Sequence, residues 1–554
     1  MTATELPTRF VRNAGSNYLL AVVMALVALV TTPILTGHLG PQKYGIWIFV
    51  GSTIAYVELL DLGLGGAVVS FVARQSAAGD DDALDRTIST SFFVLVGLGL
   101  AAFIVTVVAS QFVPDAIHLS PALRRTTRDL LIILGIDMAV SLPMDIFGCG
   151  LVALQRFELL NLSMVGVVVA QAVAWTVVLL TGGSLLELGF VTVAISLVGQ
   201  VVRWRLLRRA RPGLVVSPRL VDRSVLRSLR GPAGWFALAS SIAGFRDYAN
   251  VLVLSVVRNV ATAGAFAVGE KLALLGTKLG TPVTDPYFPH AAALVGSGDR
   301  AGLGKVARTG TRIATGVTIP CCLVVGVLAR PALSAWVGPT FVRAAPVVTI
   351  LAIAFGIASL GAAPIKIVSG SGNQKLLSKM GMAEAAVNIT LTAVLGFYFG
   401  LTGVALAMLA TVVGIELCVT LPLVCRHLGI SAVQLVRSTL RAHVVPVVGA
   451  GALGWYLSRG PLWHFVTHHG RLGNVVVVAV AGLVVLALYL AIVAVTGLDG
   501  SERRAVLARV PLTRRHRTGG APVPENPGAE DPTAEDPTAG DDLVPAPTHG
   551  AGKP

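Results

Sequence analysis

Four cations lie inside long apolar stretches of the sequence, where charged side chains are rare, and three of them are expected to lie close together. A charge at the centre of a bilayer costs at least about 2.5–3.5 kcal/mol on insertion scales, so such residues usually serve a function. Lys271 and Lys278 are two helical turns apart on one helix face, and Arg246 is expected at a depth similar to that of Lys271. Ammonium and guanidinium groups gathered at mid-membrane suit a substrate that carries phosphate.

Carboxylates inside the apolar stretches admit two interpretations. They would bind H⁺ or Na⁺ in an ion-coupled transporter or line the same cavity, or they would neutralise the cations as structural ion pairs. Consecutive helix residues point in different directions, so direct sequence neighbours do not pair well. The candidates for ion coupling or for the cavity are Glu58, Asp61, Asp137, Asp145, Asp247 and Glu270. Lys366, Glu384 and Glu416 also lie in apolar segments, and for the two glutamates a structural or boundary role is equally favoured.

The sequence lacks the motifs that several other functions require. No Walker A sequence is found, so the chain is not itself an ATP-driven pump. His464, His468 and His469 lack carboxylate support, and no cysteines have CxxC spacing, so we expect neither a metal site nor a cofactor. The loops outside the apolar segments are short, which argues against a membrane enzyme of glycan assembly.

The elements that position these residues are predicted to be membrane helices. The chain has 554 residues, of which 54% are hydrophobic and 13% charged, about half the charge of a soluble domain. Apolar segments of about 20 residues, long enough to cross a bilayer, recur along it. The sequence predicts an all-α polytopic membrane protein of about 14 transmembrane helices, in two pseudo-symmetric six-helix lobes plus two extra C-terminal helices. The predicted spans are 17–37, 44–68, 90–112, 129–152, 160–181, 185–205, 232–256, 262–286, 312–336, 345–368, 382–399, 401–424, 441–458 and 474–496.

Basic residues set the predicted topology. Segments that face the cytoplasm when the N-terminus lies inside hold about three times as many Lys and Arg as the outer segments. This predicts a cell-membrane protein with both termini in the cytoplasm, and it explains the net charge of +14 without nucleic-acid binding. The predicted units are an N-terminal lobe at 1–205, a basic cytoplasmic linker at 206–230, a C-terminal lobe at 231–425, the extra spans at 426–500 and a cytoplasmic tail at 501–554. From about residue 518 the tail is rich in Pro, Gly and acids and is predicted to be disordered.

Weak internal similarity links the two predicted lobes. Residues 153–160 are similar to residues 370–377, and residues 43–47 are more weakly similar to residues 262–266. Both pairs lie at equivalent places in the six-span halves. Parallel repeats of this kind are typical of two-lobed transporters with a site between the lobes.

Three segments resemble a known family. Leu39 to Trp47 (LGPQKYGIW), Glu58 to Gly65 (ELLDLGLG) and Ala153 to Phe157 (ALQRF) are similar to segments of the Wzx-type polysaccharide transporters. These are lipid-linked oligosaccharide flippases of the multidrug/oligosaccharidyl-lipid/polysaccharide exporter (MOP) superfamily. The resemblance covers the layout of about residues 10–500, although the clear motifs occupy only the first seventy residues and the 150–160 segment.

The resemblance implies an inward-facing pair of lobes and no enzymatic activity. A glycan linked to polyprenyl pyrophosphate would place its headgroup in the central cavity, where Arg246, Lys271 and Lys278 would meet it. Membrane lipids, and a glycan polymerase or glycosyltransferase, would be partners. Alternatives within transport are a cation-coupled exporter of the multidrug type and a peptidoglycan-precursor transporter like the lipid II flippases, whose extra helix pair borders a groove for the lipid tail. More distant alternatives are a membrane enzyme of glycan assembly and a non-transporting envelope scaffold.

Overall fold

Long helices account for nearly all of the residues that the structure describes. The computed structural model describes residues 5–58, 64–117, 119–229, 248–278, 280, 284, 287, 291, 294–295, 300–468 and 470–496, and contains no strand among them. The residues of the predicted tail, 501–554, and most of the predicted span 232–256 lie outside this set. The all-α expectation is therefore confirmed for the part of the chain that the structure describes.

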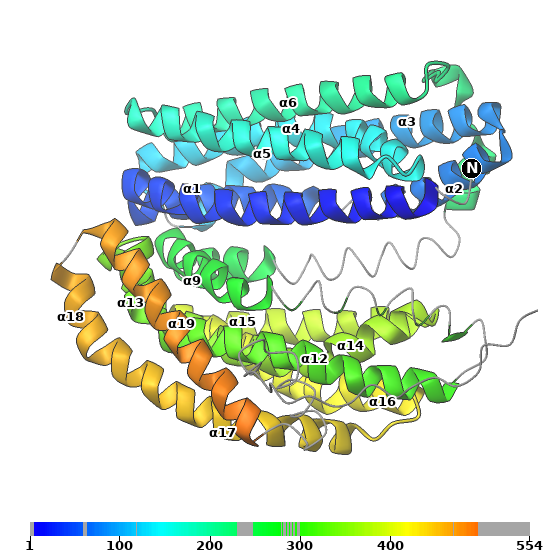
Figure 1. The fold of residues 1–554 in the computed structure, drawn as a ribbon. Coiled ribbons are helices and arrows are strands. Elements are labelled where there is room, and N and C mark those ends of the chain that lie inside the picture. The colour runs from blue at the N-terminus through cyan, green and yellow to red at the C-terminus, as the bar shows by residue number, and fades with distance from the viewer. Residues whose placement is uncertain are drawn as a thin grey trace, which may run out of the picture. The chain divides into compact units, whose positions relative to one another are not determined.

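The first group of helices contains α1 to α6. Helix α1 packs on α4 and α5, and α4 packs on α3 and α6 (Figure 1). A left-handed Gly79 precedes α3, which Asp80 caps by accepting a hydrogen bond from the Ala83 amide. A capping box of Ser184 and Glu187 starts α6. The helices are α1 (Glu5–Glu58), α2 (Leu64–Ala78), α3 (Asp81–Ala116), α4 (Pro121–Ala153), α5 (Phe157–Leu180) and α6 (Leu185–Ala210).

The second group contains α9 to α19. Helix α12 packs on α14 and α17, and α17 packs on α19. The helices are α9 (Val260–Lys278), α12 (Arg300–Val327), α13 (Ala329–Trp336), α14 (Ala345–Gly370), α15 (Gln374–Thr411), α16 (Leu421–His427), α17 (Ala432–Arg459), α18 (Pro461–His468) and α19 (Arg471–Thr496). A 3₁₀-helix, η3 (Pro339–Ala344), precedes α14, and a π-helix, η4 (Val412–Thr420), follows α15.

Two of the long helices are each a pair of predicted spans. Ten helical stretches in the described residues are long and apolar enough to cross a membrane. One of them, Gly15–Tyr56, turns at Gly40 (φ 69°, ψ 174°), and another, Lys375–His427, turns at Gly400 (φ 60°, ψ −135°). Both backbone conformations favour glycine, so the chain reverses direction without a loop. Within the second predicted span, 44–68, α1 is described as far as Glu58 and α2 begins at Leu64; residues 59–63 between them lie outside the described residues.

The linker after α6 is fastened to the start of α3. It contains η2 (Pro218–Leu220) and α7 (Arg223–Leu229). The Ser89 hydroxyl donates to the Val215 carbonyl and accepts from the Ser217 amide, and the Thr90 hydroxyl accepts from the Asp222 amide. Hydrogen bonds from Ser224 hold the pKa of the exposed Asp222 below its usual value. The described part of the predicted basic linker is therefore held against the first helix group.

Candidate functional site

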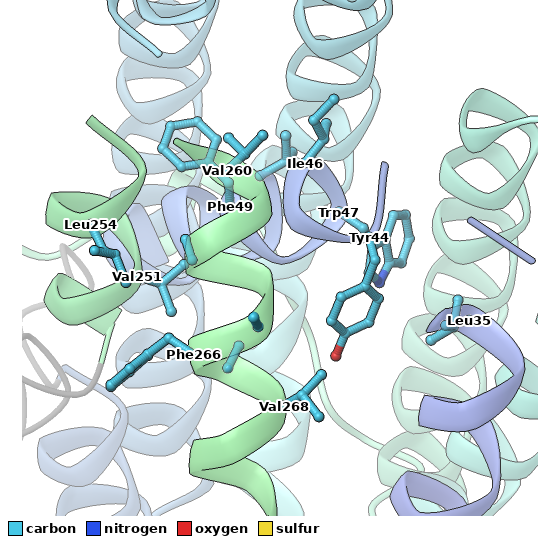
Figure 2. Close-up of a cluster of buried hydrophobic side chains, with 14 of the residues drawn as sticks. Leu35, Tyr44, Ile46, Trp47, Phe49, Val251, Leu254, Val260, Phe266 and Val268 are labelled. Carbon is cyan, nitrogen blue, oxygen red and sulfur yellow. The ribbon is translucent and has the colours of Figure 1, made fainter. Parts of the chain in front are cut away.

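The two helix groups meet where α1, just past its Gly40 turn, crosses the start of α9. A Cβ added at Gly45 would lie 2.0 Å from the Val260 carbonyl oxygen, and one at Gly264 would lie 2.8 Å from the Gly45 Cα. Only glycine fits on either side, because backbone occupies the space that a side chain would need. Figure 2 shows Tyr44, Trp47, Val260 and Phe266 among the buried side chains around this crossing.

Further contacts close the same end of the molecule. The Trp336 indole N–H donates to the Leu29 carbonyl at 2.7 Å, which joins α13 to α1. The Tyr44 and Phe341 rings pack edge to face with centroids 6.1 Å apart, which joins α1 to η3. We use the name junction for these contacts: the Gly45–Gly264 crossing, the Tyr44–Phe341 pair and the Trp336–Leu29 hydrogen bond.

Lys271 reaches the junction from α9. Its ammonium donates to the Tyr44 hydroxyl at 3.4 Å and lies 5.9 Å from the centre of the Tyr44 ring. Tyr44 is completely buried and Lys271 is half-buried. Among the described residues, Lys271 forms no ion pair, and the Tyr44 hydroxyl is the group that meets its charge. A half-buried cation at this place can attract an anionic ligand.

Of the other residues predicted to line the cavity, the structure describes some and leaves others out. Lys278 is exposed at the last turn of α9, two turns beyond Lys271. Glu270 is half-buried beside Lys271. Arg246, Asp247 and Asp61 lie outside the described residues, and Glu58 is the last residue of α1. The clustering of Arg246 with Lys271 and Lys278 thus stays a prediction.

Asp137 and Asp145 are engaged inside the first helix group. Asp145 accepts from the Gln200 amide at 3.0 Å and pairs with Arg203 at 3.4 Å, both on α6. Asp137 accepts a hydrogen bond at 3.3 Å from the Ser141 hydroxyl, which also contacts Ser196 of α6. These two carboxylates therefore link α4 to α6. The Asp145 side chain remains 62% exposed, so a second role stays open to it.

A polar cavity inside the second helix group was not expected. It has a volume of about 370 Å³, and Glu384 and Glu416 line it together with several hydroxyl-bearing side chains. Glu416 lies in the π-helix η4, a form that is frequent at functional sites. The Thr420 hydroxyl at this cavity is buried, and no described residue forms a hydrogen bond with it. Apolar-segment glutamates were visible in the sequence, but the hydroxyls that join them around one space were not.

The extra helix pair is fastened to the second group by a buried histidine. His443 of α17 contacts the Tyr489 hydroxyl of α19 at 2.6 Å and the Thr315 hydroxyl of α12 at 3.3 Å. A groove of about 380 Å³ with an almost wholly apolar lining runs beside it between α12, α14 and α17. His464 is at the other end of this region, on α18, and no group of three or more His, Cys, Asp or Glu in the described residues could hold a metal.

The predicted internal repeat has a backbone counterpart. The turn after α4 closes with hydrogen bonds from the amides of residues 154, 155 and 156 to the carbonyls of residues 150, 152 and 151. The turn after α14 repeats all three bonds 217 residues later, from residues 371, 372 and 373 to residues 367, 369 and 368. Gln155 and Gly372, at equivalent positions, both have a left-handed backbone. The junction glycines, Gly45 and Gly264, are equivalent in the second repeat segment, so the repeats contact each other through corresponding residues.

Comparison with known proteins agrees with this architecture. A model of the family described as "Polysaccharide biosynthesis protein" matches residues 10–292. The chain is 20% identical over 405 residues to the uncharacterized membrane protein EpsK of Bacillus subtilis (strain 168). The aligned region covers 72% of this chain and 80% of EpsK. The structure of the lipid II flippase MurJ, in an inward closed conformation, matches with a TM-score of 0.67 at 11% identity, over 87% of this chain and 98% of MurJ. An inward-facing multidrug resistance MATE family transporter of the MOP superfamily matches with a TM-score of 0.60 at 15% identity, over 71% of this chain and 92% of that chain. The fold is therefore that of MOP superfamily transporters.

Proposed function

Because the chain belongs to the polysaccharide biosynthesis protein family, we propose that it is a flippase for a lipid-linked oligosaccharide or polysaccharide precursor. The coarser assignment is that of a multi-pass membrane transporter with the MOP fold, a superfamily of transporters rather than enzymes. In the proposed cycle, alternating access moves the precursor from the inner to the outer leaflet of the cell membrane. Both termini then lie in the cytoplasm, and the junction closes the outer face.

Lys271 is the observation that carries the substrate proposal. It is a half-buried cation on a membrane helix, and among the described residues it contacts Tyr44 of the opposite helix group and no carboxylate. A pyrophosphate bound between the groups would meet this ammonium, with Lys278 two helical turns further along α9; Arg246 is proposed as a third cation from the sequence alone. The ligand proposed for this place is a glycan on polyprenyl pyrophosphate, and a glycan polymerase or glycosyltransferase is the proposed partner that uses or supplies it.

A cation-coupled exporter of the multidrug type is the second candidate. The polar cavity with Glu384 and Glu416 favours it, because carboxylates and hydroxyls suit a cation. A cationic drug would, however, be repelled by Lys271 at the junction. The first candidate explains both the cation at the junction and the family match, so it is the one we carry forward.

The test uses vesicles that contain the purified full-length protein and a fluorescent lipid-linked oligosaccharide. We expect the wild-type chain to move the label to the opposite leaflet, where a membrane-impermeant quencher reaches it. Lys271→Gln should slow this movement at least about tenfold, whereas Lys305→Gln, which removes an exposed lysine of α12, should not. A wild-type protein that leaves the label on its starting leaflet under every ion gradient would overturn the function. Equal rates for Lys271→Gln and wild type would overturn the role of Lys271.

A further inference from the structure

The junction holds the two helix groups together, and it also contains the cation that is proposed to bind substrate. Tyr44 takes part in both the contact between the groups and the contact with this cation. Its ring packs against Phe341 and helps hold α1 to the second helix group, and its hydroxyl accepts a hydrogen bond from the Lys271 ammonium. Gly45, the next residue, forms the closest backbone approach between the groups. The side chain that meets the cation is therefore adjacent to the point where the groups touch.

From this geometry we propose that Tyr44 and Lys271 form a latch that releases the junction when a pyrophosphate-bearing headgroup binds Lys271. The inference rests on the proposed function, because it assigns regulation to the same cationic site. An ammonium has three donors, but a pyrophosphate anion attracts it much more strongly than a neutral phenol hydroxyl at 3.4 Å. Binding of the anion would draw the ammonium away from Tyr44 and remove one contact that links α9 to α1.

The latch makes substrate binding and opening of the junction thermodynamically linked. If the Tyr44 hydroxyl and the anion compete for Lys271, the anion favours the open junction, and an open junction raises affinity for the anion by the same factor. Loss of the Tyr44 hydroxyl should act like partial occupancy, opening the junction and tightening binding. A cation that merely attracted substrate would show no such link to Tyr44.

The experiment measures the distance between spin labels at Gln42 and Thr340. Both positions are exposed at the junction, one on each helix group, and the five native cysteines are first replaced. The probes are inorganic pyrophosphate and a polyprenyl pyrophosphate, each titrated into the full-length protein in lipid nanodiscs. Tyr44→Phe keeps the ring that packs on Phe341 and removes only the hydroxyl, so folding should be preserved.

We expect wild type to give one short distance, and either pyrophosphate probe to add a longer one. A response to both probes assigns the effect to the pyrophosphate group, and a response to the lipid alone assigns it to the anchored headgroup. Tyr44→Phe should lower the half-saturating probe concentration about fivefold, the size expected for the net contribution of one typical hydrogen bond. Lys271→Gln should abolish the response.

Two results would overturn the latch: no change of distance with either probe, or a Tyr44→Phe titration that superimposes on wild type. The vesicle assay separates this outcome from failure of the proposed function. If wild type moves the lipid-linked oligosaccharide but Tyr44→Phe titrates like wild type, only the latch fails. If the latch responds but no oligosaccharide is moved, the function fails and the anion-dependent opening of the junction stands.

Discussion

Replacement of Gly45 by alanine should force the junction apart. The added methyl would lie 2.0 Å from the Val260 carbonyl oxygen and 2.5 Å from its carbon, both of which are backbone atoms that cannot rotate away. To reach an ordinary contact of 3.4 Å, the two helices must separate by about 1.4 Å. Helix α1 would therefore lose its close packing on α9, while each helix remains intact.

The size of the effect follows from the cost of overpacking. An extra methyl in a tightly packed contact typically costs about 1–3 kcal/mol. If that cost falls only on the closed junction, the ratio of closed to open molecules falls by about 5- to 150-fold. The same spin-label pair, at Gln42 and Thr340, should then show a long distance in Gly45→Ala without any ligand.

The matched control is Gly51→Ala, six residues further along the same helix. A Cβ at Gly51 has no neighbour within 4 Å, and alanine is the better helix former, so this variant should keep the wild-type distance. Gly264→Ala, whose Cβ would meet the Gly45 Cα at 2.8 Å, should reproduce the opening from the other side. If Gly45→Ala inserts normally and its distances match those of Gly51→Ala, the junction is not the closure described here.

Three further substitutions test the packing of the lobes by thermal unfolding in detergent. His443→Leu should lower the free energy of unfolding by about 1–3 kcal/mol, because it leaves the buried Tyr489 hydroxyl without its partner at 2.6 Å. The double variant with Tyr489→Phe should recover part of this loss, and strictly additive losses would contradict the network. Gly372→Ala, at φ 88°, should lower the free energy of unfolding by about 1–2 kcal/mol, whereas Gly356→Ala, with open space at its Cβ, should not. Equal melting temperatures for the two variants would argue against a left-handed turn at Gly372. Arg258→Gln should lower the melting temperature by releasing three carbonyls at the end of the first half of α15, and an unchanged value would show that these bonds are replaced by water.

Apolar length alone predicted most of the architecture. A bilayer fixes the length of a span, so the predicted segments coincide with α3 to α6 and with α14, α17 and α19, with ends that differ by at most nine residues. Both turns inside long helices also fall between predicted spans: Gly40 lies between 17–37 and 44–68, and Gly400 separates 382–399 from 401–424. The second predicted span, 44–68, includes residues 59–63, which lie outside the described residues.

The sequence gives no reason for the arginines in the segments that are predicted to face outward. Arg124 pairs with Asp115 at 2.6 Å and donates to the Leu119 carbonyl, at the end of α3. Arg258 caps the carbonyls of residues 396 to 398, and Arg343 donates to the Ala261 carbonyl. The carbonyls that Arg258 meets are at the end of the first half of α15, where a helix C-terminus leaves them unsatisfied. Composition-based topology rules cannot predict such local contacts, because they count charges and do not consider the acceptors around each one.

The junction was the least predictable feature, because a glycine in an apolar segment gives no chemical signal. Its logic lies in the repeat. Near a pseudo-twofold relation, equivalent positions of the two halves approach each other, so a side chain at one glycine would meet the backbone of its counterpart. Symmetry thus requires small residues at both Gly45 and Gly264. The flanking positions need not match, and they do not: Tyr44 corresponds to Ala263, and Lys271 corresponds to Ser52. The symmetric pair lets the helices touch, and the asymmetric pair places one cation and one phenol beside that contact, which is where a substrate anion would have most influence on it.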